Sequence, residues 1–129
     1  MTTIAVIEDN ADNRLLLQAI LDGMYDVVEY ENGVDALAGL SASLPDLVLL
    51  DISLPGMDGN EILARIRADA RLRALPVIAL TAHAMSGDRE KYLAAGFNDY
   101  ITKPIVDETL LLSAIERWLQ ASRDGQVKG

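Results

Sequence analysis

Five short apolar runs, separated by longer stretches of helical period, constrain the fold of this chain more than any other feature. The runs are rich in Val, Ile and Leu and predict strands at Ile4–Glu8, Val27–Tyr30, Asp46–Asp51, Val77–Thr81 and Asp99–Thr102. Strands that alternate with helices form βα units and a mostly parallel sheet. Their near-continuous apolarity indicates that helices cover both faces of that sheet. The pattern therefore predicts a doubly wound α/β fold.

The stretches between the strands carry signals of amphipathic helices. In the first helix one buried stripe is predicted, made of Leu15, Leu16, Ala19 and Ile20. The third helix has the same spacing at Ile62, Leu63 and Ile66. Asp58, with Glu61 three residues later, predicts the start of that third helix as a capping box.

The last predicted helix, about 106–120, carries more apolar residues than one core stripe needs. They are Leu110, Leu111, Leu112, Ile115, Trp118 and Leu119. Two interpretations stay open: part of this face is exposed for a partner, or the core contact is wide and one leucine lies on the surface. After Ala121 the residues are polar and small, which predicts a frayed end.

Length and composition exclude several classes of protein. The 129 residues fit one domain, expected at residues 1–121 and followed by a flexible tail at 122–129. Without cysteine there is no disulfide, thiolate metal site or cysteine nucleophile. The net charge of −9 would repel nucleic-acid phosphates, so direct nucleic-acid binding is not expected. Neither a signal peptide nor a membrane span is predicted, and the expected compartment is the cytoplasm.

Four of the predicted strands end on groups that handle phosphate or metal. The first ends at Glu8 and Asp9, the third at Asp51, the fourth at Thr81 and the fifth at Lys103. In open α/β sheets the carboxyl ends of the strands form the edge where ligands bind. We therefore expect three acids, a hydroxyl and an ammonium to converge in one cleft.

These residue types fit metal-assisted phosphoryl transfer. A carboxylate at a strand tip, Asp51, can attack phosphorus and form an acyl phosphate. Glu8 and Asp9 crowd negative charge that a cation would neutralise, and Mg²⁺ prefers such oxygen ligands. Thr81 and Lys103 could donate to the transferred group. Taken singly, each residue also has an ordinary interpretation: a loop cap, a solvated acidic turn, a strand-end threonine and a surface lysine.

Read together, these motifs resemble the receiver domain of bacterial two-component response regulators. The resemblance covers residues 3–120 in order, through Glu8-Asp9-Asn10, Asp51 with Pro55 and Gly59, Thr81-Ala82 and Lys103-Pro104. It implies a single doubly wound (βα)5 domain with a flavodoxin-like parallel five-stranded sheet of order 2-1-3-4-5.

The resemblance also implies a function and a set of site residues. Asp51 would receive a phosphoryl group from a phosphohistidine of a histidine kinase or histidine phosphotransfer protein. Mg²⁺ would be bound by Asp9, Asp51 and the backbone carbonyl of Ser53, with Glu8 acting mainly through a water. A switch would move Thr81 toward the phosphate and turn Tyr100 inward, and the Lys103–Pro104 peptide bond would be cis. His83, the one histidine, is interpreted as a rim residue.

Three other functions compete with this one. A haloacid-dehalogenase-like phosphohydrolase would need an aspartate where Ser53 stands. A flavin-binding module would need a glycine- and hydroxyl-rich phosphate loop where residues 9–13 are acidic. A degenerate receiver used only as a scaffold would lack some of the site residues that are present here.

Within the receiver interpretation the output remains open. We expect a stand-alone regulator with no attached output domain, which catalyses only its own phosphorylation and dephosphorylation. It would act on a kinase or another regulator as its target, through the face formed by the fourth helix, fifth strand and fifth helix. The alternative is a receiver excised from a hybrid histidine kinase.

Overall fold

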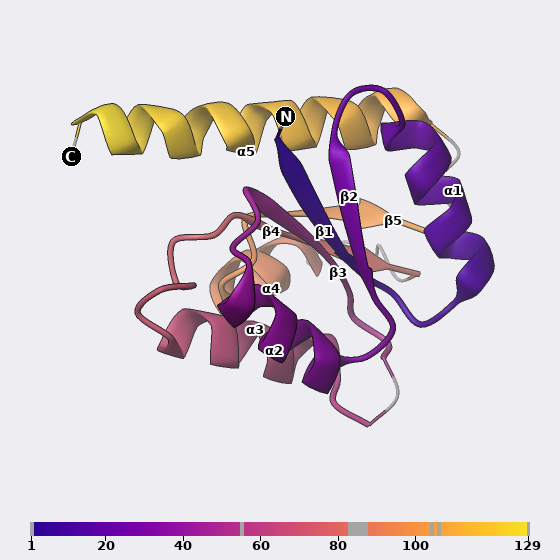
Figure 1. Ribbon diagram of the computed structural model, residues 1–129, viewed down its shortest axis with the longest axis horizontal. Coiled ribbons are helices and arrows are strands. Elements are labelled where there is room, and N and C mark those ends of the chain that lie inside the picture. Colours follow the sequence, from indigo (N-terminus) through magenta and orange to yellow (C-terminus); the bar gives the residue numbers. More distant parts are fainter. Residues whose placement is uncertain (1, 55, 83–87, 104, 106, 129) are drawn as a thin grey trace.

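Five parallel strands form one sheet in the order β2-β1-β3-β4-β5, as the resemblance implied (Figure 1). The computed structural model describes residues 2–54, 56–82, 88–103, 105 and 107–128. The strands are β1 Thr3–Ile7, β2 Asp26–Tyr30, β3 Leu47–Asp51, β4 Val77–Thr81 and β5 Asp99–Thr102. The helices are α1 Ala11–Leu21, α2 Gly33–Ala42, α3 Gly59–Ala68, α4 Asp88–Ala95 and α5 Glu108–Lys128.

Helices cover both faces of the sheet and enclose two apolar cores. Figure 1 shows α1 and α5 on one face, with α2, α3 and α4 on the other. Strands β3 and β4 are buried along their whole length, because they lie in the interior of the sheet under both helix layers. Alternate side chains of the same strand enter different cores: Val48 and Leu50 face one cluster, whereas Leu47 and Leu49 face the other. The predicted doubly wound architecture is confirmed.

The predicted buried stripe of α1 is wrong in its phase. The buried residues are Leu17, Ile20 and Leu21, while Leu15 is 65% exposed and Leu16 39% exposed. Three consecutive leucines allow more than one helical stripe, so their spacing alone did not fix which face packs. The packing of α1 into the apolar cluster that it shares with β1, β3 and α5 selects the stripe that begins at Leu17.

Helix α5 differs from the prediction at both ends. It begins at Glu108 and continues to Lys128, well past the predicted end at Gln120 (Figure 1). No proline interrupts residues 121–128, and Arg, Gln and Lys are good helix formers, so the helix continues through Gly125, which costs only about 1 kcal/mol relative to alanine. Leu111, Ile115 and Leu119 are buried, whereas Leu110 is 63% exposed. Flexibility of residues 122–129 stays a prediction.

The starts of α1 and α3 are explained by their capping residues. Asn10 accepts a hydrogen bond from the amide of Asn13 at 3.0 Å and begins α1. Asp58 accepts from the amide of Glu61 at 2.9 Å and begins α3, as the capping motif predicted. In the part of the chain that the structure describes, we find no helix with the length and apolarity needed to cross a membrane.

Candidate functional site

The strand ends that carry the predicted site residues meet at one edge of the sheet. The register pairs Ile7 with Leu50, Asp51 with Leu80, and Thr81 with Thr102. Each polar residue therefore follows or ends a strand at nearly the same height. The sheet order places the acids after β1 next to Asp51 of β3, with Thr81 of β4 beside it.

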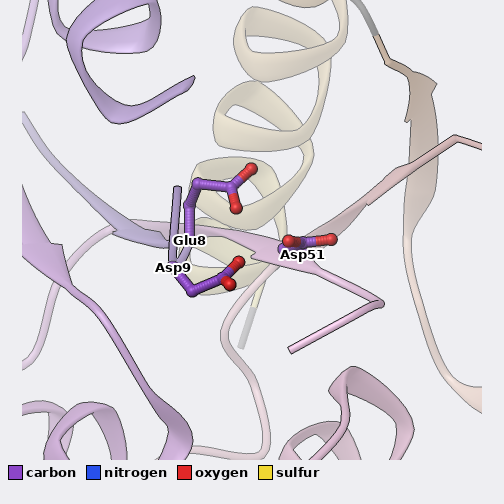
Figure 2. Close-up of side chains that lie close together, drawn as sticks. All are labelled: Glu8, Asp9 and Asp51. Atoms are coloured by element: carbon purple, nitrogen blue, oxygen red, sulfur yellow. The ribbon is translucent and has the colours of Figure 1, made fainter. Parts of the chain in front are cut away.

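Glu8, Asp9 and Asp51 form a compact group of acids. Figure 2 shows the three carboxylates pointing into the same space from the ends of β1 and β3. One oxygen of each lies within 4.8 Å of the other two. Glu8 and Asp51 are 1% and 2% exposed, whereas Asp9 lies on the surface. Two buried acids and one at the rim leave the group open to solvent on one side.

Lys103 is the cation that partly balances these acids. Its Nζ lies 3.1 Å from Oδ1 of Asp51 and 3.2 Å from Oε1 of Glu8. Burial alone would lower the pKa of Lys103, but hydrogen bonds and the charges of Asp51 and Glu8 outweigh it and raise the pKa. The ammonium is therefore charged, and among the described residues it is one positive charge beside three acids.

Burial and crowding raise the pKa of Glu8 from 4.5 to about 7. Burial contributes most, and the nearby Asp51 carboxylate adds to it. Hydrogen bonds from Lys103 and from the amide of Asn10 act in the opposite direction without cancelling the rise. The expected repulsion between carboxylates is thus present, and without a further cation Glu8 carries a proton through much of the acidic range.

The loop after β1 is held by Asn13 and Arg14, two polar residues that sequence reasoning missed. Asn13 donates from Nδ2 to Oε1 of Glu8 at 3.1 Å. Arg14 donates to the backbone carbonyls of Glu8 at 2.8 Å and Asp9 at 3.0 Å, and pairs with Glu31 at 3.1 Å. Their position in the first turn of α1, four and five residues after Asp9, was the available signal, since a helix cap brings that turn back over the loop.

Asp51 is positioned by the loop that follows it. The amide of Ser53 donates to Oδ1 of Asp51 at 3.0 Å. Gly59 packs directly beneath: a Cβ there would lie 2.7 Å from the Asp51 carbonyl oxygen and 2.8 Å from Cα of Ile52. Only glycine permits this approach, so α3 begins against the end of β3 and fixes the loop that carries Ser53.

Thr81 is buried beside a tyrosine of α4, Tyr92, which in turn packs against Tyr100. Its hydroxyl and that of Tyr92 lie 2.9 Å apart, and both residues are buried. The Tyr92 ring is 5.6 Å from the ring of Tyr100, the predicted switch residue. Tyr92 is a further residue that sequence reasoning missed, because its contact with Thr81 depends on how α4 packs. The Lys103–Pro104 peptide bond and His83 involve positions outside the described residues.

The donor set of this site fits a hard divalent cation. The grouped side chains offer carboxylate oxygens, the ligands that Mg²⁺ prefers. In an octahedral Mg²⁺ site opposite ligands are about 4.2 Å apart, close to the separation within this group. Burial, followed by the nearby Asp51 carboxylate, raises the pKa of Glu8, and a bound cation would favour its ionised form.

Comparison with known proteins finds one matching family and similar proteins of two kinds, a long sensor protein and a short regulator. The family model described as "Response regulator receiver domain" matches residues 4–116. The chain is 39% identical over 119 residues to the sensor protein GacS of Pseudomonas syringae pv. syringae, covering 89% of this chain and 13% of GacS. It is 38% identical over 104 residues to the polar-differentiation response regulator DivK of Brucella anthropi, covering 80% of this chain and 85% of DivK.

A solved structure with the same fold contains a metal ion at its active site. It is the receiver domain of the sensor histidine kinase PA1611 from Pseudomonas aeruginosa PAO1, with magnesium coordinated in the active site cleft. The TM-score is 0.83 and the identity 37%, over 92% of this chain and 98% of that one. The chain therefore resembles both a small segment of a long sensor protein and most of a short regulator.

Proposed function

This chain belongs to the response regulator receiver domain family, and we propose that the carboxylate of Asp51 is its phosphoryl acceptor. The family is a phosphoryl-accepting signalling module rather than a conventional enzyme. The observation that carries the residue assignment is the position of Asp51, buried among two acids and an ammonium at the end of β3.

The donor in this proposal is a phosphohistidine of a histidine kinase or a histidine phosphotransfer protein. An oxygen of Asp51 attacks phosphorus, the new O–P bond forms, and the N–P bond to the histidine breaks with its electron pair leaving on the imidazole. Because Oδ1 already accepts from Ser53 and Lys103, we assign the attack to Oδ2. The chain would thereby catalyse its own phosphorylation. Dephosphorylation would follow when water attacks phosphorus, the O–P bond to Asp51 breaks, and inorganic phosphate and the Asp51 carboxylate are released.

The other site residues neutralise charge and orient the group. Asp9, Asp51 and the backbone carbonyl of Ser53 would hold Mg²⁺, with Glu8 acting mainly through a water because Asn10, Asn13 and Lys103 already use its oxygens. When bound, the metal ion supplies positive charge that reduces repulsion between Asp51 and the incoming phosphoryl group.

Two donors complete the proposed site. The ammonium of Lys103 already lies within hydrogen-bonding distance of Asp51, and it would donate to an oxygen of a phosphoryl group bound there. Thr81 would turn toward another phosphoryl oxygen, and Tyr100 would change position with it as part of the switch. The added charge on Asp51 would thus change the surface around β5 and alter affinity for a kinase or a second regulator.

Phosphorylation with a small donor tests the assignment of Asp51. Protein incubated with acetyl phosphate and Mg²⁺ should gain the mass of one phosphoryl group, measured by intact-protein mass spectrometry. Asp51→Asn and EDTA should each abolish the gain. Asp12→Asn, an exposed aspartate in the first turn of α1, is the matched control and should behave as wild type. Phosphorylation of Asp51→Asn at the wild-type level would disprove the assignment.

The extent of the receiver unit and its context are also proposals. We place the unit at residues 1–121, with 122–129 as a flexible tail, and limited proteolysis should cut first within the tail. The similarity to DivK, which the chain matches over most of its length, favours stand-alone action, while the match to GacS favours a receiver within a longer sensor protein. Capture of partners by wild type and Asp51→Asn under phosphorylating conditions should differ; equal capture would refute a phosphorylation-dependent interface.

A further inference from the structure

We infer that Tyr92 is a positioning residue of the switch, whose hydroxyl holds Thr81 in the unphosphorylated position and opposes phosphorylation of Asp51. The inference rests on the proposed function, because it concerns the movement of Thr81 toward a phosphoryl group. It adds a residue of α4 to the site, through a hydrogen bond that neither the strand-end motifs nor the family resemblance indicated.

The geometry places Tyr92 and Asp51 on different sides of Thr81. Strand β4, which ends at Thr81, lies between β3, which ends at Asp51, and β5. The Tyr92 ring packs against Tyr100, a residue of β5. A turn of the Thr81 hydroxyl toward Asp51 therefore moves it away from Tyr92. The 2.9 Å contact between the hydroxyls of Thr81 and Tyr92 therefore competes with a contact between Thr81 and a phosphoryl group on Asp51.

Because both partners are buried, this hydrogen bond affects the equilibrium between Thr81 beside Tyr92 and Thr81 turned toward Asp51. Thr81 is 2% exposed and Tyr92 is 7% exposed, so water does not freely replace either partner. The Tyr92 ring is also fixed by an edge-on contact with Phe97, with centroids 6.0 Å apart. The phenol therefore does not follow Thr81 unless α4 itself shifts, and the bond is lost when Thr81 leaves.

An interaction present only in the free state weakens any ligand that requires the other state. A buried neutral hydrogen bond contributes enough to change an equilibrium constant by about three- to tenfold. Removing the Tyr92 hydroxyl should make the phosphorylated arrangement easier to reach by that factor. Tyr92→Phe keeps the ring and its contacts with Phe97 and Tyr100, so it isolates the hydroxyl.

Binding of beryllofluoride, a mimic of the aspartyl phosphate, gives the most direct test. Its apparent dissociation constant with saturating Mg²⁺ would be measured by NMR titration. We expect a constant about three- to tenfold lower in Tyr92→Phe than in wild type. Tyr30→Phe, which removes a hydroxyl from a partly buried tyrosine on the same side of the sheet, is the control and should match wild type.

A double-mutant cycle separates this role from a general packing effect. In a Thr81→Ala background, where the hydrogen bond is already absent, Tyr92→Phe should change the constant by less than about twofold. Urea unfolding provides a second readout: Tyr92→Phe should lower stability in the free protein and less so with saturating beryllofluoride. A structural role alone would lower both equally.

The outcomes distinguish this inference from the proposed function. No beryllofluoride binding by wild type would overturn the proposed function and this inference with it. Binding by wild type and not by Asp51→Asn, together with an unchanged or higher constant in Tyr92→Phe, would overturn the role of Tyr92 alone. An equal gain from Tyr92→Phe in the Thr81→Ala background would do the same.

Discussion

Glu8 should make the stability of the metal-free protein depend on pH between about 4.5 and 7. Its carboxyl is buried, and burial together with Asp51 raises its pKa from 4.5 to about 7. The folded state therefore holds this proton more tightly than the unfolded state does. Stability from this group is fully present below pH 4.5, falls as the pH rises, and is lost above about pH 7.

The expected size of the effect follows from the two pKa values. Each pH unit between them is worth about 1.4 kcal/mol, so the rise to about 7 corresponds to about 3 kcal/mol. Among the other described groups whose pKa is shifted, Lys103 and Asp107 change charge outside this range, because their ordinary pKa values are 10.5 and 3.8, and the guanidinium of Arg67 stays charged throughout it. Glu8 is thus the group with a shifted pKa that changes charge between pH 5 and 8.

Urea unfolding in EDTA, followed by circular dichroism, would measure this effect at pH 5 and pH 8. Glu8→Gln is the control because it removes the titrating carboxyl and keeps a side chain of nearly the same size. The variant and wild type should differ little at pH 5, whereas at pH 8 the variant should be more stable by about 3 kcal/mol. Saturating Mg²⁺ should reduce that difference at pH 8, since a bound cation favours the ionised carboxylate. A difference between the two proteins that is the same at both pH values in EDTA would refute the reasoning.

Three further substitutions test the contacts that hold the site and the fold. Lys103→Met removes the ammonium 3.1 Å from Asp51 and 3.2 Å from Glu8, and should destabilise the protein by about 3 kcal/mol at pH 8. The loss should be smaller at pH 5 in the same urea assay, because Glu8 is then protonated and the contact with Asp51 remains. Gly59→Ala forces a Cβ against backbone atoms at 2.7 Å and 2.8 Å, and should cost about 1–3 kcal/mol and slow phosphorylation by acetyl phosphate, measured by mass spectrometry over time. Arg67→Ala removes donors to three backbone carbonyls and an asparagine, and should lower the free energy of unfolding by about 2–3 kcal/mol. Its control, Arg65→Ala, loses one exposed ion pair and should lower it by less than about 0.5 kcal/mol. Equal losses for the two variants in thermal or urea unfolding would contradict this interpretation.

The strand ends were predictable because the apolar runs, and the polar residue that ends each run, are local features of the chain. Continuous runs such as Val77–Thr81 can be buried on both faces only as interior strands, and the polar residue that ends each run must then lie at the carboxyl edge. The positions of Asp51 and Thr81 at the carboxyl edge of the sheet therefore follow from local sequence alone. The strand bounds differ from the prediction by one residue at most.

Helix phases and helix ends were less predictable. Leu15, Leu16 and Leu17 are the same residue type, so residue type alone does not show which one is buried. The packing of α1 on the sheet buries only Leu17. The end of α5 was placed too early, because the polar residues after Ala121 indicated exposure and not the loss of helix. Hydrophobic pattern reports burial, whereas helix continuation depends on backbone hydrogen bonds that polar residues also make.

By itself the sequence determined the sheet and the residue types at its carboxyl edge, because both depend on side chains close together along the chain. The tertiary structure decided which groups pair across the fold: Lys103 with Glu8, separated by 95 residues, and the hydroxyl of Thr81 with that of Tyr92. It also determined how far burial raises the pKa of Glu8, since desolvation depends on everything packed around the carboxyl. Residue type fixes which chemistry is available, while distance and burial fix the strength of each interaction.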